Sequence, residues 1–354
     1  MPTTVVKSIK ASGGDYTTVA AWESSEQGDL VTADEIQKGE LYDETYTGLA
    51  TIDGSTTDAT RYMIISVAEG NRHNGTAGGG GAVIDPTGSG HVFEVSDDNF
   101  HAEWLRITGW VGTSSEAFRV NNTNFHLDKS IIHSGTVSEQ DGVYVGSNSI
   151  VLFIKNSIFY SLDRAAVHIQ SHQSVTIHVH NCTGWDLTIG AGINNIGFGF
   201  DNNSGRDNTG SVVHCDNVTA HTGGSTNVFG GGGATGQEGT VNCTNCASSD
   251  NSISTGPFVV EIGVGNLESV TQADQFVDLS TIDLHLKAGA DFIDAGIDLS
   301  SDGDLPVIQD IDGDSRGVPY DIGADQFVTP MDGWHTEMVF PSIPDPVMLP
   351  SGMM

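Results

Sequence analysis

The fold of this chain is decided by the stretch Phe118-Arg119-Val120 and Phe125-His126-Leu127-Asp128-Lys129, because its two alternating strands recur about every 25 residues. The inward residues of the second strand form one column: Ala102, Leu127, Ile154, Val179, Cys215 and Cys243. Those of the first strand form another: Val95, Val120, Val145, Ile169 and Phe200. Units this short cannot bury their apolar faces alone, so they must stack into a solenoid.

The turn after the second strand repeats an asparagine in register, at Asn156, Asn181, Asn217 and Asn245. Asparagine tolerates left-handed backbone, and stacked side chains can bond to one another and to turn backbone. The pattern therefore predicts an asparagine ladder. Strands that repeat in one direction form parallel sheets, whose crossovers are right-handed.

The chain has four cysteines, of which Cys243 and Cys246 form a C-x-x-C. This spacing alone is typical of zinc or redox chemistry. However, Cys215 and Cys243 stand at inward positions, while Cys182 and Cys246 each follow an aligned asparagine. We favour buried, stacked thiols, with a disulfide or a metal site as the alternatives.

Two further motifs point to a known family. Gly81-Ala82-Val83-Ile84-Asp85 runs into His91–Val95, and the acidic turn Asp310–Gly317 precedes Tyr320–Asp325. With the coils, they resemble the right-handed parallel β-helix family with pectate-lyase-like coils, over about residues 55–327. The last motif is similar to the closing segment of many bacterial and phage β-helix surface proteins. The resemblance implies an all-β fold, a right-handed single-stranded parallel β-helix solenoid with an N-terminal cap and a C-terminal closing unit.

The expected organisation has four parts. Residues 1–60 form an N-terminal cap, with a short amphipathic helix near Thr17–Glu26, and residues 61–271 form the parallel β-helix. Residues 272–327 form the closing unit. Residues 328–354 form a Pro/Met-rich tail, which we expect to dock on a neighbouring subunit. The interaction residues predicted there are Trp334, Met338, Phe340 and Met348.

Composition excludes some functions. Lys and Arg total 13 against 46 Asp and Glu, a formal net charge of −33. Nucleic-acid binding needs a basic face, and an anionic membrane is disfavoured for the same reason. The N-terminus lacks an apolar signal region, and no stretch approaches the length of a membrane span. We therefore expect neither nucleic acid nor membrane as a partner.

One outward column is rich in imidazole. Its histidines, His101, His126, His178 and His214, lie on the same face as the carboxylates Glu103 and Asp128, because side chains alternate along a strand. A histidine and a carboxylate two residues apart can bind a divalent metal or act as an acid–base pair. The alternative, which we favour, is a surface ladder in which neighbouring rungs pair.

The acidic turn suggests one cofactor. Asp310, Asp312 and Asp314 with Gly313 resemble the start of a calcium loop, and Asp321 stands where such a loop has its bidentate acid. The alternative is a structural turn, in which Arg316 pairs with a carboxylate and holds the last coil.

An enzyme is the less favoured interpretation. The resemblance includes lyases, whose carboxylate-bound calcium lies beside a catalytic Arg or Lys. Here Lys129, Lys155, Arg106 and Arg119 have no acidic cluster around them in the pattern. A hydrolase needs two carboxylates across a groove, which Glu139, Asp141 and Asp163 could supply from adjacent coils.

The sequence thus predicts a non-catalytic structural or adhesive protein of a virion surface: a phage capsid decoration, fibre or spike component. Its partners would be neighbouring virion or capsid proteins, bound through the tail, and a host glycan. By analogy we expect a homo-oligomer, a homotrimer. The first alternative is a carbohydrate-binding or carbohydrate-cleaving tailspike, and the second is a bacterial surface adhesin.

Overall fold

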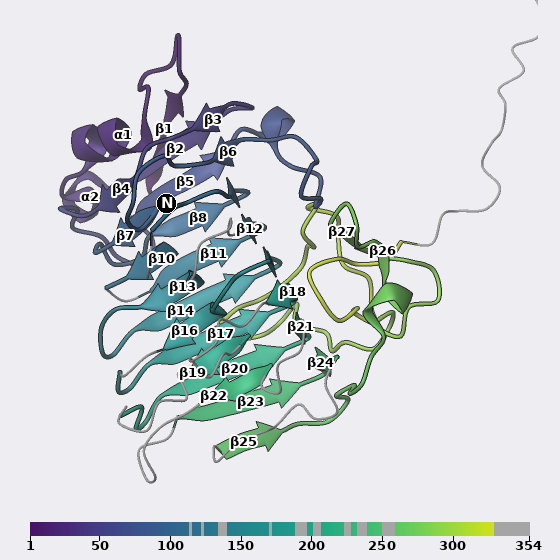
Figure 1. Ribbon diagram of the computed structural model, residues 1–354. Helices are drawn as coiled ribbons and strands as arrows, with labels where there is room; N and C mark the ends of the chain where they lie inside the picture. Colours follow the sequence, from purple (N-terminus) through teal and green to yellow (C-terminus); the bar gives the residue numbers. More distant parts are fainter. Residues whose placement is uncertain are drawn as a thin grey trace, which may run out of the picture.

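The computed structural model describes residues 1–112, 115–121, 124–133, 140–169, 172–187, 197–200, 207–222, 228–231, 239–249 and 259–328. In this part of the chain the strands form a parallel β-helix (Figure 1). A complete coil contributes one strand to each of three parallel sheets, and the first and last coils contribute fewer, which gives the all-β solenoid expected from the repeat.

The sheets are named here in the order in which the chain visits them. Sheet 1 has ten strands: β1 (Thr3–Ile9), β2 (Glu35–Leu41), β5 (Met63–Val67), β8 (His101–Glu103), β11 (Phe125–Asp128), β14 (Val151–Lys155), β17 (Thr176–His180), β20 (Val212–Asp216), β23 (Thr240–Thr244) and β25 (Val259–Ile262). Sheet 2 has eight: β3 (Thr45–Tyr46), β6 (Val83–Ile84), β9 (Arg106–Ile107), β12 (Ile131–His133), β15 (Ile158–Tyr160), β18 (Thr183–Leu187), β21 (Thr219–Thr222) and β24 (Ala247–Ser248). Sheet 3 has seven: β4 (Ala50–Ile52), β7 (Phe93–Val95), β10 (Glu116–Val120), β13 (Asp141–Val145), β16 (Ala165–Ile169), β19 (Phe198–Phe200) and β22 (Phe229–Gly231).

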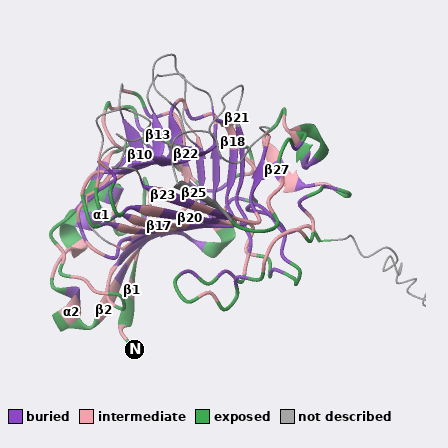
Figure 2. Ribbon diagram, turned by 90° about the horizontal axis from the view of Figure 1, so that it is seen from below, coloured by how far each residue is buried: buried purple, intermediate pink, exposed green. Residues whose placement is uncertain are grey.

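Both predicted inward columns are confirmed. Leu127 pairs with Ala102 and Ile154, and the column continues in register to Cys243. Val120 pairs with Val95 and Val145 in sheet 3. The column residues are fully buried, and such burial contributes about 1.5–3 kcal/mol per large aliphatic side chain. Figure 2 shows the buried strands inside the stack and exposed residues on the loops and the N-terminal helices.

The four cysteines are buried free thiols, so the disulfide alternative is wrong. Cys215 lies opposite Cys243 on the neighbouring rung of sheet 1. Burial raises the pKa of the Cys182 thiol to about 12, which keeps it protonated. The thiols therefore act as small core side chains.

The N-terminal segment both caps and extends the solenoid. Helix α1 (Val19–Glu26) is capped by Thr18, whose hydroxyl accepts from the Ala21 amide at 3.1 Å, and α1 contacts β4, the first strand of sheet 3. Its Trp22 is fully buried over Gly39, where a Cβ would lie 2.9 Å from the indole ring. A second helix, α2 (Leu30–Ala33), precedes β2. Because β1 and β2 already belong to sheet 1, residues 1–60 include the first rungs as well as a cap.

The closing unit lies on the flank of the stack rather than over its last coil (Figure 1). It contains the 3-10 helix η2 (Gln272–Asp274) and the antiparallel pair β26 (Phe276–Asp278) and β27 (Asp283–Leu286). Its apolar residues, such as Phe292, form one buried cluster with Ile158 and Tyr160 of sheet 2. The outer face of sheet 2 is apolar enough to need a cover, and the closing unit supplies it.

The asparagine ladder is confirmed. Asn156, Asn181, Asn217 and Asn245 have φ of 47°, 50°, 55° and 49°, the left-handed conformation that asparagine tolerates. The Asn217 amide donates to Asn181 Oδ1 at 3.4 Å, and its other bonds reach the closing unit. Of the residues that the structure describes, none belongs to a helix long and apolar enough to cross a bilayer.

Candidate functional site

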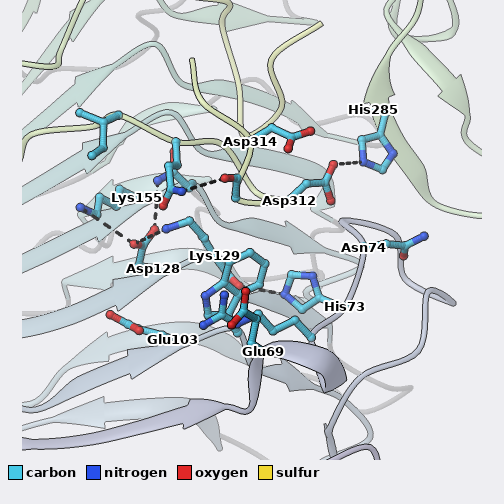
Figure 3. Close-up of a pocket in the computed structure, with 16 residues that line it drawn as sticks. Glu69, His73, Asn74, Glu103, Asp128, Lys129, Lys155, His285, Asp312 and Asp314 are labelled. Carbon is cyan, nitrogen blue, oxygen red and sulfur yellow. Dashed lines mark hydrogen bonds and ion pairs between the residues drawn. The ribbon is translucent and has the colours of Figure 1, made fainter. Parts of the chain in front are cut away.

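A cleft of about 1020 Å³ opens between the solenoid and the closing unit. Its walls come from the turn after sheet 1, the segment around the 3-10 helix η1 (Glu69–Asn71), β27 and the acidic turn (Figure 3). The lining residues are Glu69, Arg72, His73, Asn74, Glu103, Trp104, Asp128, Lys129, Lys155, Asn156, His285, Ile308, Gln309, Asp312, Gly313 and Asp314.

The solenoid wall is built by outward residues of neighbouring rungs. Asp128 lies in register between Glu103 of β8 and Lys155 of β14. Asp128 Oδ2 is 2.9 Å from Lys129 Nζ and 3.9 Å from Lys155 Nζ, and its Oδ1 accepts from the Asn156 amide at 3.0 Å. The wall therefore presents a carboxylate held between two ammonium groups, which adjacent rungs bring together because they lie about 4.8 Å apart.

In the coils before Asn156, the turn position of the asparagine ladder is occupied by other residues, and these line the cleft. Trp104 and Lys129 end β8 and β11 with φ of 62° and 46°, the same left-handed position that Asn156 occupies in the next coil. This conformation is unfavourable for residues other than glycine, asparagine and aspartate, and such strain concentrates at functional sites. The Lys129 ammonium lies 5.4 Å from the centre of the Trp104 ring.

Glu103 differs from its neighbours in the wall. The residues that the structure describes offer its side chain no hydrogen bond or ion pair, and Figure 3 shows its carboxylate apart from the contacts of Asp128. Burial, and then the charge of Asp128, raises the pKa of Glu103. Glu103 also lines a smaller cavity of about 250 Å³ along the outer face of sheet 1. It is a half-buried carboxyl directed at open space.

The segment after η1 closes one side of the cleft. His73 Nε2 bonds to the Lys129 carbonyl at 2.8 Å, and its Nδ1 accepts from the Gly75 amide at 3.2 Å. Burial lowers the pKa of His73 to about 4, so its ring is neutral with the proton on Nε2. The Arg72 guanidinium stands 4.5 Å from the Trp104 ring centre, a cation–π contact.

His285 dominates the wall supplied by the closing unit. Its Nε2 is 2.8 Å from Asp312 Oδ2 (Figure 3), and its Nδ1 is 2.5 Å from Asp283 Oδ1. Burial opposes the charge on the ring, but the hydrogen bond to Asp312 and the nearby Asp325 outweigh it and raise the pKa of His285 to about 10. The ring is a cation held between carboxylates.

The acidic turn is arranged differently from the expected calcium loop. Asp310 Oδ1 accepts from the amides of Asp312 and Asp314, and its Oδ2 accepts from the amide of Gln326. Within the described residues, the group close enough to hold a metal is His285, Asp312 and Asp325, which excludes Asp310 and Asp314. The geometry matches the structural alternative, and calcium at Asp310, Asp312 and Asp314 stays a prediction.

Arg316 holds the closing unit, but its partners differ from those expected. Its buried guanidinium donates to the carbonyls of Gly323 at 3.0 Å and Ala324 at 2.7 Å, and to Asn156 Oδ1 at 3.4 Å. The prediction of a carboxylate partner is wrong, since the nearest acids act on Arg316 through charge alone. Arg316 joins the acidic turn to the asparagine ladder on the flank of the stack.

The predicted histidine column is a stacked aromatic ladder. His101 lies over His126 with ring centres 4.1 Å apart, His126 over Phe153 at 4.6 Å, and His178 over His214 at 5.1 Å. Burial lowers the pKa of His126 to about 4 and that of His101 well below its usual range. Burial thus keeps the rings of His101 and His126 neutral, and within the described residues the column does not meet Glu103 and Asp128 as a metal-binding group.

Of the acids proposed for a hydrolase, Asp141 is closed off by its own partners. Asp141 is fully buried, where its carboxylate accepts from Arg164 Nε at 2.9 Å and contacts His168 Nδ1 at 2.8 Å. It is a structural ion-pair centre in sheet 3 and is not available as one of the two carboxylates that a hydrolase groove needs. Asp163 is described and half-buried, and Glu139 lies outside the described residues.

Sequence reasoning missed several residues of the cleft. Trp104, Glu69, Arg72, His73 and His285 attracted no prediction, and Lys129 was noted only as an isolated base. Lys129 and Trp104 could have been predicted, because they occupy the position of the asparagine column one and two coils upstream of Asn156. The predicted interaction residues Trp334, Met338, Phe340 and Met348 lie outside the described residues.

Comparison with known proteins supports the fold. No protein-family model and no curated protein matches the sequence. Among solved structures, the chain is similar to the crystal structure of pectate lyase Pel9A, with a TM-score of 0.50 and 14% sequence identity. The match covers 93% of this chain and 97% of that chain. A likeness at this identity shows the fold alone, a right-handed parallel β-helix.

Proposed function

We propose that this protein is a non-catalytic adhesive component of a virion surface and that its cleft binds a host glycan. The observation that carries the proposal is the cleft itself, a polar cavity of about 1020 Å³ with carboxylates, cations and an indole on its walls. Its size suits a short oligosaccharide, since ligand sites typically measure about 300–1,000 Å³.

Sugar hydroxyls both donate and accept hydrogen bonds, so a glycan site needs both kinds of partner. Glu103 and Asp314 are acceptors in the cleft, while Lys155 and Arg72 are donors. The cleft is thus nearly balanced in charge although the whole chain carries −33. This balance favours a neutral or weakly charged glycan over a strongly anionic one.

The charge arrangement favours binding over cleavage. Glycoside hydrolysis needs one protonated and one free carboxyl flanking the bond. Glu103 fits the first role, but the carboxylate in register with it is Asp128, whose oxygens are held by Lys129 and Asn156. An oxygen committed to these partners is a poor nucleophile or base.

The location on a particle rests on the acidic composition and the tail. A net charge of −33 keeps a crowded surface protein soluble and separate from its neighbours. The tail, residues 328–354, would dock on neighbouring virion or capsid proteins, and the chain would assemble as a homo-oligomer. Deleting residues 329–354 should then prevent incorporation into particles, while the isolated protein keeps its circular dichroism spectrum.

The binding claim is tested by presenting the purified full-length protein to a panel of neutral and acidic glycans and titrating the best binder by calorimetry. We expect Glu103→Gln and Lys155→Gln to weaken binding by about tenfold or more, because each removes a charge-assisted hydrogen bond. Asp274→Asn is the matched control, since Asp274 is exposed on the closing unit and outside the cleft. It should bind as the wild type does.

Mass spectrometry of the incubated glycan separates binding from cleavage. An unchanged glycan agrees with the proposal, whereas release of shorter sugars that stops in Asp128→Asn would establish the carbohydrate-cleaving alternative. Equal binding by wild type and both cleft variants would reject the cleft as the site.

A further inference from the structure

Three potential metal ligands meet at the edge of the cleft. His285 of β27, Asp312 of the acidic turn and Asp325 each offer one ligand atom, and these atoms lie within 4.8 Å of one another. The segment that faces them is the loop around Gly75, from the solenoid side of the cleft. The group therefore joins three segments of the closing unit, and the Gly75 loop packs against it.

Gly75 packs closely against two of these ligands. A Cβ on Gly75 would lie 2.6 Å from Asp312 Oδ1 and 2.6 Å from His285 Nε2, so a larger residue at position 75 would displace both atoms. Among the described residues, Asp312 Oδ1 is buried without a hydrogen-bond partner. A buried carboxylate oxygen without a partner is costly, and a bound cation is one explanation for its retention.

Each ligand is held in place by a further group. Asp283 Oδ1 lies 2.5 Å from His285 Nδ1, which orients the ring so that Nε2 faces Asp312. The Leu286 amide donates to Asp325 Oδ2 at 2.7 Å, and the Asp312 amide donates to Asp310 Oδ1 at 3.1 Å. A carboxylate behind the imidazole is the arrangement that commonly supports metal-bound histidine.

We propose that His285, Asp312 and Asp325 form a binding site for a divalent transition metal of the Zn²⁺ class. One imidazole with two carboxylates suits such ions, whereas Ca²⁺ prefers a shell of oxygen ligands. The ion takes the place of the proton shared between Nε2 and Asp312 Oδ2. It ties β27 to the acidic turn and to Asp325 within the closing unit, at the edge of the cleft where Gly75 packs against them.

The site differs from the calcium loop predicted from the sequence. That loop would use Asp310 and Asp314, but both oxygens of Asp310 accept backbone amides, and Asp314 lies outside the group. Asp312 alone is common to the two sites. The two assignments therefore make opposite predictions for Asp314 and for His285.

The test is a titration of the full-length protein, freed of metal by dialysis against EDTA, with Zn²⁺ in competition with a chromogenic chelator at neutral pH. We expect one ion per chain and a rise in melting temperature on loading. Asp312→Asn and His285→Gln should each weaken Zn²⁺ binding by about tenfold or more, because each removes a direct ligand. Circular dichroism of the metal-free variants verifies that both are folded.

Asp314→Asn is the control and should bind Zn²⁺ within about twofold of the wild type, because Asp314 is not a ligand. The proposal is overturned if the wild-type protein binds no Zn²⁺. It is also overturned if both ligand variants retain wild-type affinity, which would place the ion elsewhere, for example on the histidine ladder. Tighter binding of Ca²⁺ that Asp314→Asn abolishes would support the calcium loop instead.

Discussion

The left-handed residue in the turn after sheet 1 has different contacts in the early coils and in the late coils. In the later coils, Asn181, Asn217 and Asn245 donate to carbonyls of the closing unit, which sits directly on them. In the earlier coils the column continues with Trp104 and Lys129, which line the cleft, and the closing unit meets Trp104 through Gly313 of the acidic turn.

The difference shows how one repeat serves both stability and recognition. Asparagine relieves the left-handed backbone and satisfies the carbonyls that the closing unit brings, so the covered end is optimised for packing. Trp104 and Lys129 carry backbone strain without this relief, and their largely buried side chains line the cleft. Backbone strain that is kept beside the cleft indicates selection for a property other than stability.

The largest loss of stability is expected from replacing Arg316, which joins the acidic turn to the asparagine ladder. Arg316→Met keeps most of the side-chain volume but leaves the carbonyls of Gly323 and Ala324 without their buried donor. We expect a loss of about 3–5 kcal/mol in the free energy of unfolding, measured by urea denaturation. Arg61→Met, which removes a partly exposed surface pair with Asp58, should cost much less. Equal losses in the two variants would contradict the role given to Arg316.

Asn217 tests the contact between the asparagine ladder and the closing unit. Its side chain makes two reciprocal bonds of 2.8 Å with the backbone of Ile297, and its φ is 55°. Asn217→Ala should lower the free energy of unfolding by about 2–4 kcal/mol, from lost bonds and from backbone strain. Hydrogen exchange should show faster exchange at Ile297 and Gly323, whose amides bond to Asn217. If Asn217→Ala leaves the free energy of unfolding unchanged, the docking of the closing unit does not depend on the ladder.

The outer ladder of sheet 1 should make stability depend on pH. Burial lowers the pKa of His126 to about 4 from its usual 6.5, so its contribution is complete above 6.5 and is lost as pH falls toward 4. We expect a loss of about 1–2 kcal/mol over this window. His126→Phe, which imitates Phe153 in the same stack, should reduce the slope of melting temperature against pH. An unchanged slope would exclude His126 as its source.

The smallest effect on stability, with a large effect on binding, is expected from Lys129→Asn. Asparagine suits the φ of 46°, which offsets the lost ion pair with Asp128, so the free energy of unfolding should change by less than about 1 kcal/mol. Glycan binding should fall, because an ammonium of the cleft is gone. If binding persists and stability drops, Lys129 belongs with the structural part of the column.

The solenoid was predictable because its signal is periodic and local. The inward columns, the asparagine ladder and the stacking of His101 on His126 all follow from a repeat that places equivalent residues one rung apart. The stacked thiols followed from the same alignment, since Cys215 and Cys243 fall in the inward column.

The cleft was not predictable by this route, because it depends on where the closing unit docks. Arg316 meets Asn156 across 160 residues, and Asn217 meets Ile297 across 80. No periodicity links such partners, so His285 and the loop at Gly75 gave no signal. The burial of Asp141 was missed for a related reason, since Arg164 and His168 reach it from the next coil.

The measurement that tests the account most directly is hydrogen exchange of the protein with and without the tightest glycan from the panel. We predict slower exchange on binding at residues 103–104, 128–129 and 312–314, and no change at Asn181, Asn217 and Asn245, because the closing unit already covers that end. Protection confined to sheet 3 or to the covered end would contradict the assignment of the cleft as the recognition site.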